Sequence, residues 1–173
     1  LHIREENGHI SAASNSALSM ARGDFVALLD HDDLLDEDAL FWVAYTLEQS
    51  PDSGLIYSDE DKVSVSGIFS EPHFKPDWNP ELFLCYNYLC HFTIIRTSLI
   101  QQIGGFREGF EGAQDYDLFL RCSEQLSANQ ITHIPRVLYH WRSHQESTAQ
   151  AITSKPYAAV AAERALEEHF TRT

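Results

Sequence analysis

The sequence has few cysteines and no long apolar run. Its three cysteines (Cys85, Cys90 and Cys122) form no Cys-x-x-Cys pair, so we expect neither a disulfide framework nor a zinc ribbon. We expect them to be small core residues, and the pattern fits a reducing compartment and a cytoplasmic location. The longest apolar runs, at 25–29 and 92–95, have the length of strands, which excludes a bilayer-spanning helix within them.

Positive charge is also scarce. Twelve lysines and arginines face twenty-six aspartates and glutamates, which gives a formal net charge of -14. Such a surface repels nucleic acid, so we expect no polynucleotide partner. It would also repel a phosphorylated ligand unless a divalent cation or a local basic group intervened. Alternatively, the acidity only serves solubility. The first seven residues carry charge without an apolar core and do not resemble a signal peptide.

Helical segments and short apolar segments alternate along the chain. This order is typical of an α/β fold with a mostly parallel sheet flanked by helices, and 43% hydrophobic content supports one domain with one sizeable core. The expected helices cover 8–20, 37–49, 97–103, 114–124 and 156–170, with a further helix start at 79–81. The expected strands cover 24–29, which we predict to be buried on both faces, 54–58, 91–96, 131–134 and 137–141.

An acidic D-x-D-D string, Asp30–Asp33, follows the first of these strands. Ligands of parallel sheets bind beyond the carboxyl ends of the strands. Because side chains alternate along extended backbone, Asp30 and Asp32 are expected on the same side. Two carboxylates there would suit Mg²⁺ or Mn²⁺, which could support a diphosphate leaving group. An acidic turn that caps the following helix, with Asp36 as the cap, explains the string equally well.

Two other readings of acidic residues stay open. Haloacid-dehalogenase-like phosphatases also carry an aspartate pair after an apolar strand, but Leu34 stands where they usually have Thr or Val. The second acidic strand end, Asp59–Asp61 with Lys62, could contact an acceptor, although a solvated turn is the favoured interpretation.

A glycine-rich segment leads into the helix expected at 114–124, and Asp115 lies in its first turn. A general base at this place needs desolvation to raise its pKa against the helix dipole, and Phe119 on the same face could supply an apolar wall. Asp117 lies two positions further and points elsewhere. The alternative is that both acids simply favour a helix N-terminus.

The last string, from Tyr139 to His144, brings two histidines, a tryptophan and an arginine together at a strand end. This composition suits metal, pyrophosphate and sugar contacts, although a lone histidine is usually structural. His140 and His144 are not expected to share one role, because the strand ends between them.

Taken in order, these strings resemble glycosyltransferase family 2 in its GT-A fold, and in particular bacterial transferases that build O-antigen and other surface polysaccharides. The likeness runs from about Glu6 to Thr148. The strings that carry it are a small-residue helix with Asn15, FVALLDHDD, IYSDED, FKPDWNPELF, IGGFREGFEGAQDYDLFLR and YHWRSHQEST.

The resemblance implies inverting transfer of a sugar from a nucleotide-diphosphate donor to an acceptor hydroxyl. Asp30 and Asp32 match the D-x-D motif that holds a Mn²⁺ or Mg²⁺ ion and the donor diphosphate. Asp115 matches the general base. The implied acceptor is a glycan or lipid-linked glycan, which would bring the protein to the inner face of the membrane.

Further positions carry over from the late string. His144 matches a histidine that completes the metal site with Asp32, and Trp141 and Arg142 lie where relatives contact donor or acceptor. Gln114 stands where the family usually has Glu. No Q-x-x-R-W string is present, which disfavours a processive synthase.

The chain starts later than the family pattern, because the first βα unit, which forms most of the nucleobase pocket, is missing before Leu1. We therefore expect a partial domain, with 1–58 as the rest of the nucleotide-sugar half, 59–150 as the acceptor half and 151–173 as a C-terminal helix. An unpaired sheet edge would favour self-association, and the fragment itself could be inactive. A non-catalytic module that binds nucleotide sugar or glycan is the second hypothesis.

Overall fold

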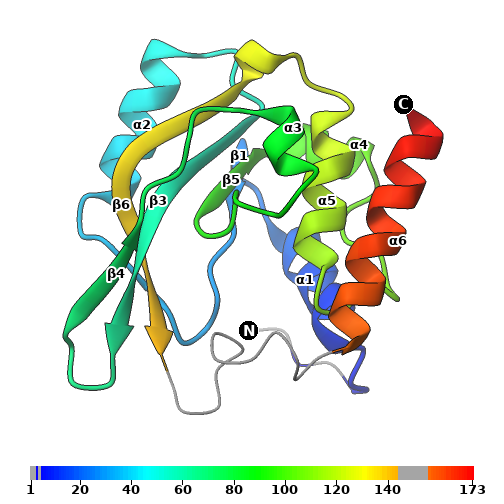
Figure 1. Ribbon diagram of the computed structural model, residues 1–173, viewed down its shortest axis with the longest axis horizontal. Coiled ribbons are helices and arrows are strands. Elements are labelled where there is room, and N and C mark those ends of the chain that lie inside the picture. The colour runs from blue at the N-terminus through cyan, green and yellow to red at the C-terminus, as the bar shows by residue number, and fades with distance from the viewer. Residues whose placement is uncertain (1–2, 4, 144–155) are drawn as a thin grey trace. The chain divides into compact units, whose positions relative to one another are not determined.

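The computed structural model describes residues 3, 5–143 and 156–173, and it confirms the α/β class (Figure 1). The helices are α1 (His9–Met20), α2 (Ala39–Gln49), α3 (Pro80–Phe83), α4 (Thr97–Gln102), α5 (Gln114–Ser123) and α6 (Pro156–Arg172), with a 3-10 helix η1 (Ala128–Gln130). The strands are β1 (Phe25–Ala27), β2 (Leu34–Leu35), β3 (Leu55–Ser64), β4 (Phe69–His73), β5 (Thr93–Arg96) and β6 (Ile131–Ser143).

The sheet is mixed rather than mostly parallel. Its strand order is β1-β5-β3-β6-β2, with β4 paired to β3 outside this path. Only β3 and β6 among the registered pairs run parallel, from Leu55↔Ile131 to Ser64↔Ser143. β2, β4 and β5 pair antiparallel with their neighbours. The β3–β4 connection is a tight hairpin at Gly67 (φ +80°), which only an antiparallel pair permits.

The chain divides into two compact units. The larger, unit 2, comprises the described part of Ala27–Ile95 and Leu126–Gln150. Its core forms around the first half of β3, where Leu55, Ile56 and Tyr57 are fully buried. Helix α2 packs against β6 (Figure 1). The long β3–β6 pair thus forms the frame on which the polar side chains of this unit are arranged.

Unit 1 comprises the described part of Leu1–Val26, Arg96–Gln125 and Ala151–Thr173, and in it α5 and α6 lie side by side (Figure 1). Asp117 of α5 is wholly buried and accepts hydrogen bonds from Arg107 and Arg121. The Asn15 side chain exchanges two hydrogen bonds of 2.8 and 2.9 Å with the backbone of Phe106. Arg107 also donates to Glu168 of α6, so these contacts connect α1, α5 and α6 through the segment that carries Phe106 and Arg107.

Two expectations at the start of the chain were wrong in their bounds. The first strand is only three residues long and not buried on both faces, because β1 lies at the end of the strand order. Helix α2 begins at Ala39 rather than Glu37. Asp36 accepts a hydrogen bond from the backbone N–H of Asp38 at 2.9 Å, so it closes the turn before the helix instead of capping the helix.

Two further differences concern the strands. β3 continues through Ser64, so the acidic residues Asp59–Asp61 lie within a paired strand and not in a solvated turn. The two strands expected at 131–134 and 137–141 are one continuous strand, β6. Pairing with a long neighbour explains both, since each extra residue of β3 gains ladder hydrogen bonds to β6. Cys122 is buried as expected, but Cys85 is exposed.

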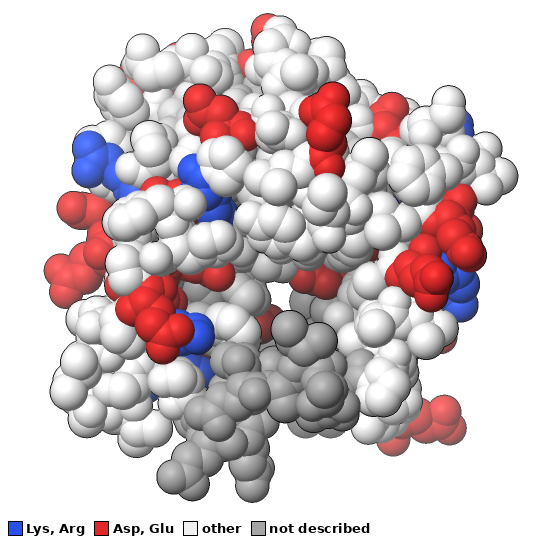
Figure 2. Space-filling model, in the orientation of Figure 1, with Lys and Arg blue, Asp and Glu red and all other residues white. Residues whose placement is uncertain are grey.

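None of the helices in the described ranges combines the length and the apolar character that crossing a bilayer requires. On the face drawn in Figure 2, acidic side chains outnumber basic ones and are scattered over the surface.

Candidate functional site

The D-x-D-D string forms a loop between β1 and β2 that is fastened to β6. Asp33 is 9% exposed, and its carboxylate accepts hydrogen bonds from the Tyr139 hydroxyl and from the backbone N–H of Arg142, the latter at 2.7 Å. The backbone N–H of Asp33 donates to the carbonyl of Asp30 at 3.3 Å, which closes the turn. Asp33 therefore holds the loop in place.

The structure brings three of the expected donor-site residues together. The Arg142 guanidinium donates from Nε to the backbone carbonyl of Asp32 at 2.6 Å, and the backbone N–H of Asp30 lies 3.4 Å from the Tyr139 hydroxyl. The Asp32 side chain is 41% exposed. The loop thus presents carboxylates beside a guanidinium, a pairing that suits a metal ion and a phosphate.

Tyr139 is fully buried and remains a hydrogen-bond donor at ordinary pH. Burial and the neighbouring Asp33 carboxylate raise the pKa of its phenol well above the usual value. The phenol O–H is therefore a permanent link between β6 and the aspartate loop.

A second cluster surrounds the Glu60 carboxylate on β3. Lys75 lies 3.4 Å away and His91 Nδ1 lies 3.1 Å away, and the backbone N–H of His91 also donates to Glu60. His73 Nδ1 approaches the other carboxylate oxygen at 3.7 Å. The Lys75 side chain is fully buried and also donates to the carbonyl of His91, so the cluster pairs its buried charges.

Burial and pairing oppose each other in this cluster. Burial alone would raise the pKa of the Glu60 carboxyl, but the hydrogen bond from His91 and the charge of Lys75 outweigh it and lower that pKa. Burial lowers the pKa of Lys75 despite its pairing with Glu60. For His91, burial would lower the pKa, whereas the bond to Glu60 raises it above 6.5. Glu60 is therefore ionised and His91 is biased toward its charged form.

The aspartate loop and the Glu60 cluster share one face of the sheet. The His91 ring stacks on the Tyr139 ring, with centroids 4.9 Å apart and planes 16° apart, and lies 5.3 Å from the Trp141 ring. Tyr139 in turn bonds to Asp33. A continuous set of contacts thus connects the loop with Glu60 through the ring of His91.

The opposite face of β6 holds a histidine in a structural setting. His140 Nδ1 lies 2.6 Å from Asp61, its Nε2 lies 3.9 Å from Asp36, and its ring packs 4.6 Å from the Phe69 ring. Because both ring nitrogens face carboxylates of its own unit, His140 joins β2, β3 and β4. His144, expected to have a separate role, lies outside the described residues.

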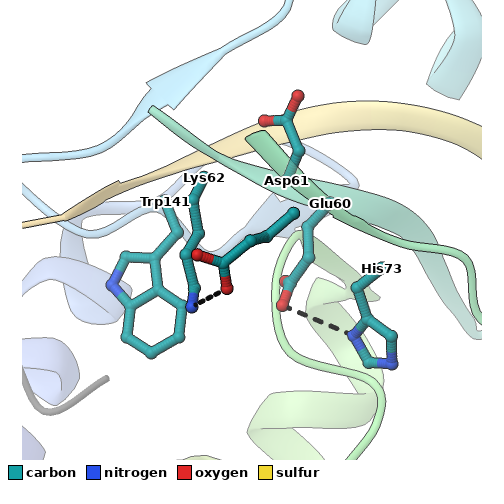
Figure 3. Close-up of a pocket in the computed structure, with 6 residues that line it drawn as sticks. Glu60, Asp61, Lys62, His73 and Trp141 are labelled. Carbon is teal, nitrogen blue, oxygen red and sulfur yellow. Dashed lines mark hydrogen bonds and ion pairs between the residues drawn. The ribbon is translucent and has the colours of Figure 1, made fainter. Parts of the chain in front are cut away.

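A hollow of about 250 Å³ opens beside the Glu60 cluster (Figure 3). Figure 3 shows Glu60 and Lys62 on one side of β3 and Asp61 projecting to the other, as strand alternation requires. The lining residues come from β3, β4 and β6 and are Glu60, Asp61, Lys62, Glu71, His73 and Trp141.

Two of the expected metal ligands, Asp30 and Asp32, lie in the aspartate loop between β1 and β2. Within the described residues no group of three or more His, Cys, Asp or Glu side chains is arranged to hold a metal ion. Asp30 and Asp32 nevertheless supply the hard oxygen donors of a Mg²⁺ or Mn²⁺ ion that is bound by one or two carboxylates together with substrate phosphates. The donor set therefore fits such an ion.

The expected base, Asp115, belongs to unit 1 and lies in the first turn of α5, where it is half-buried. Gln114, the departure from the family pattern, accepts a hydrogen bond of 2.7 Å from the backbone N–H of Gly112 and so shapes the turn before the helix. The Asp117 carboxylate forms ion pairs with Arg107 and Arg121, so it has a structural role distinct from that of Asp115.

Comparison with known proteins decides the family. The model of the family described as glycosyl transferase family 2 matches residues 2–104, more than half of the chain. The chain belongs to glycosyl transferase family 2. This membership supports a transferase and leaves the phosphatase interpretation without support.

Sequence relatives of this family 2 chain are much longer. An uncharacterised protein of Sinorhizobium fredii is 53% identical over 171 residues, 99% of this chain and 19% of its own length. The O-antigen biosynthesis protein RfbC of Myxococcus xanthus is 41% identical over 165 residues, 95% of this chain and 13% of its own length. The chain thus spans less than a fifth of these two curated relatives.

Solved structures share the fold. S. aureus TarS 1-349 in complex with UDP-GlcNAc superposes with a TM-score of 0.70 at 18% identity, over 96% of this chain and 48% of TarS. The mannosyltransferase PcManGT of Pyrobaculum calidifontis, in complex with GDP-Man and Mn²⁺, gives a TM-score of 0.55 at 18% identity, over 97% and 44%. These likenesses confirm the GT-A fold.

Sequence reasoning missed Asp33, Tyr139 and His91 as parts of the site. Asp33 could have been suspected from the D-x-D-D string. If the first two carboxylates of the string face a ligand, the third needs a hydrogen-bond partner within the protein. Tyr139 lies two positions before Trp141, and side-chain alternation places it on the same face of β6. His91 carries no such signal, since its partner Glu60 is 31 residues away.

Proposed function

We propose that this chain is part of an inverting, metal-dependent glycosyltransferase that moves a sugar from a nucleotide-diphosphate donor to an acceptor hydroxyl in cell-surface polysaccharide synthesis. Membership of family 2, together with an aspartate loop that Asp33 fastens beside Arg142, supports the proposal. The relative RfbC, an O-antigen biosynthesis protein, supports the polysaccharide context.

In this proposal the loop binds the donor diphosphate. Asp30 and Asp32 would ligate a divalent cation, Mn²⁺ or Mg²⁺, with His144 as a further ligand, and Arg142 would pair with a phosphate oxygen. The cation, when bound, neutralises charge on the departing nucleoside diphosphate. The Mn²⁺ complex of PcManGT is consistent with a divalent cation. Trp141 would contact the donor or the acceptor.

Asp115 is proposed as the general base that removes the proton of the acceptor hydroxyl while that oxygen attacks the anomeric carbon in line. Of the two acids in the first turn of α5, it is the suitable one, because Asp117 is bound by Arg107 and Arg121. Attack and departure on opposite sides of one carbon invert its configuration.

The remaining expectations rest on the same proposal. A glycan or lipid-linked glycan is the proposed acceptor, which would bring the protein to the inner face of the membrane. The division at residues 58 and 150 into nucleotide-sugar half, acceptor half and C-terminal segment, and self-association through a sheet edge, also stay predictions. Light scattering at high concentration tests the last, and a clean monomer would contradict it.

Calorimetric titration of UDP and dTDP, with and without Mn²⁺, tests the donor site. We expect Mn²⁺-dependent binding of one of them, lost in Asp32→Ala. Asp52→Ala is the matched control, because it removes an exposed aspartate from the turn before β3 and should leave binding unchanged. Nucleotide binding that is independent of Mn²⁺, or that is unchanged in Asp32→Ala, would refute the proposal that the aspartate loop is the donor site.

A further inference from the structure

Helix α2 is apolar on its exposed side as well as on its buried side. It packs on β6, and its buried residues are Ala39 and Val43 (Figure 1). Leu40, Phe41 and Tyr45 are nevertheless 68%, 60% and 47% exposed. A helix that is apolar all round is normally buried on all sides, so this exposed side indicates a binding surface. We call its four exposed apolar residues the α2 patch: Leu40, Phe41, Ala44 and Tyr45.

The aromatic rings of the α2 patch hold one another in place. Phe41 stacks on Tyr45, with ring centroids 6.3 Å apart and planes 22° apart. Both rings make edge-to-face contacts with Trp42, at 5.3 and 5.7 Å. The Arg136 guanidinium lies 3.6 Å from the centroid of the Trp42 ring, so one ring beside the patch already binds a cation. Rings that are ordered before binding lose little conformational freedom when a partner docks, which suits them as anchors of an interface.

The spacing of the patch suits a second helix. Leu40, Ala44 and Glu48 form one row at four-residue spacing, and Phe41 and Tyr45 form the next row. Side chains of one helix pack into the groove between two such rows of another. Ala44 has the shortest side chain of the patch, so it leaves room in this groove for a side chain of the partner.

Charge defines the chemistry of the partner. Acidic residues flank the patch at both ends: Glu37 and Asp38 precede the helix, and Glu48 and Asp52 lie at its C-terminal end, all four exposed. The last turn of α2 holds no basic residue, although the helix dipole favours a cation there. No lysine or arginine occurs anywhere between positions 23 and 61. The flanks and the aromatic faces of the patch therefore both attract lysine and arginine side chains.

The same charges disfavour two other occupants. Two copies of this chain that paired through α2 would bring acidic flanks together in either helix direction, because acids lie at both ends, and each copy carries a formal charge of -14. An anionic bilayer surface would repel the patch for the same reason.

We propose that the α2 patch docks a basic amphipathic helix of a partner protein. Apolar side chains of that helix would fill the groove between the two rows, and its lysines or arginines would lie over the rings and beside the acidic flanks. The proposal goes beyond glycosyl transfer, since the patch shares no residue with the aspartate loop or the Glu60 cluster.

Fluorescence anisotropy with a labelled synthetic peptide tests this surface on the full chain. The probe is a sixteen-residue peptide of four Leu-Lys-Lys-Leu repeats, which is amphipathic as a helix. We expect it to bind more weakly as salt is added. A peptide with glutamate in place of lysine should not bind. A peptide of the same composition with leucine and lysine in strict alternation, which is amphipathic only as a strand, should bind about tenfold more weakly.

Two variants locate the binding on α2. Phe41→Ala should weaken binding of the Leu-Lys-Lys-Leu peptide about tenfold, whereas Phe170→Ala, which removes an exposed ring from α6, should leave it unchanged. Glu48→Lys should weaken it at least threefold. This change favours the helix dipole, so a loss of binding cannot come from unfolding of α2. Its matched control is Glu163→Lys, which reverses an exposed charge on α6.

Several results would overturn the proposal: no binding of the basic helical peptide, equal binding of the acidic or the alternating peptide, or equal effects of the α2 variants and their α6 controls. Sedimentation velocity and co-sedimentation with vesicles of phosphatidylethanolamine and phosphatidylglycerol test the other occupants. A dimer, or vesicle binding, that is lost in Phe41→Ala would assign the patch to a second copy or to a membrane instead. No nucleotide or sugar enters these assays, so their outcome is independent of the donor-site test.

Discussion

The bond between Tyr139 and Asp33 offers the sharpest test of how the aspartate loop is held. Tyr139→Phe keeps the ring that stacks on His91 and removes only the hydroxyl. Asp33 then retains the backbone N–H of Arg142 as a donor but loses the phenol. A hydrogen bond to a charged group contributes about 1.5–3 kcal/mol, so we expect the free energy of unfolding to fall by an amount in this range.

We expect Tyr139→Phe to weaken ligand binding as well, because the loop that carries Asp30 and Asp32 loses one of its two hydrogen bonds from β6 to Asp33. Each 1.4 kcal/mol is a factor of ten, so we expect the affinity for UDP with Mn²⁺ to fall about tenfold. Urea unfolding measures the stability and calorimetry the affinity.

Tyr57→Phe is the matched control for this experiment. Tyr57 is also a fully buried tyrosine of the same sheet, and its hydroxyl donates to the carbonyl of Pro76 at 2.7 Å. This variant should lower stability by about 0.5–1.5 kcal/mol, because its acceptor is neutral, and leave UDP affinity unchanged. If Tyr139→Phe binds UDP as the wild type does, or if both variants weaken binding equally, the loop is not held by this bond.

Three further predictions concern the base, the buried cluster and the helical unit. Asp115→Asn should abolish sugar transfer and leave UDP binding unchanged in calorimetry; unchanged transfer would show that the base is another group. NMR titration should give His91 a pKa above 6.5 in the wild type and below 6.5 in Glu60→Gln, because burial of the ring remains when the carboxylate is lost; an unchanged His91 pKa in the variant would contradict the pairing. The stability that protonated His91 contributes is complete below pH 6.5 and is lost as the pH rises through its folded-state pKa. Arg121→Ala should lower the free energy of unfolding by about 3–5 kcal/mol in urea, because it removes one of the two arginines that pair with the buried Asp117; a loss below about 1 kcal/mol would contradict a structural role for the pair.

The sequence predicted what local patterns determine. Small residues at helical spacing gave α1, Asn79 and Pro80 gave the start of α3, where the Asn79 side chain accepts from the N–H of Leu82 at 2.8 Å, and the D-x-D-D string gave the loop. These features depend on neighbours within a few residues. The same is true of Asp115, whose place in the first turn of α5 follows from the glycines before it.

The Glu60 cluster could not be predicted, because its members come from three distant segments. Lys75 is 15 residues and His91 is 31 residues from Glu60, and only the sheet register brings them together. The continuation of β3 through its acidic residues has the same origin. An acidic string alone favours a turn, but a long parallel partner supplies backbone hydrogen bonds that outweigh this local preference.

The length of β6 has a consequence for how this protein can change over evolution. Four consecutive residues of this strand serve different parts of the unit. Tyr139 and Trp141 lie on the face of β6 that contacts His91, and His140 lies on the opposite face. The backbone N–H of Arg142 donates to Asp33 of the aspartate loop. Insertion of a single residue before Tyr139 would exchange the two faces and move every one of these groups at once. Single side chains along β6 can therefore be exchanged one at a time, whereas its length between His133 and Arg142 must be preserved.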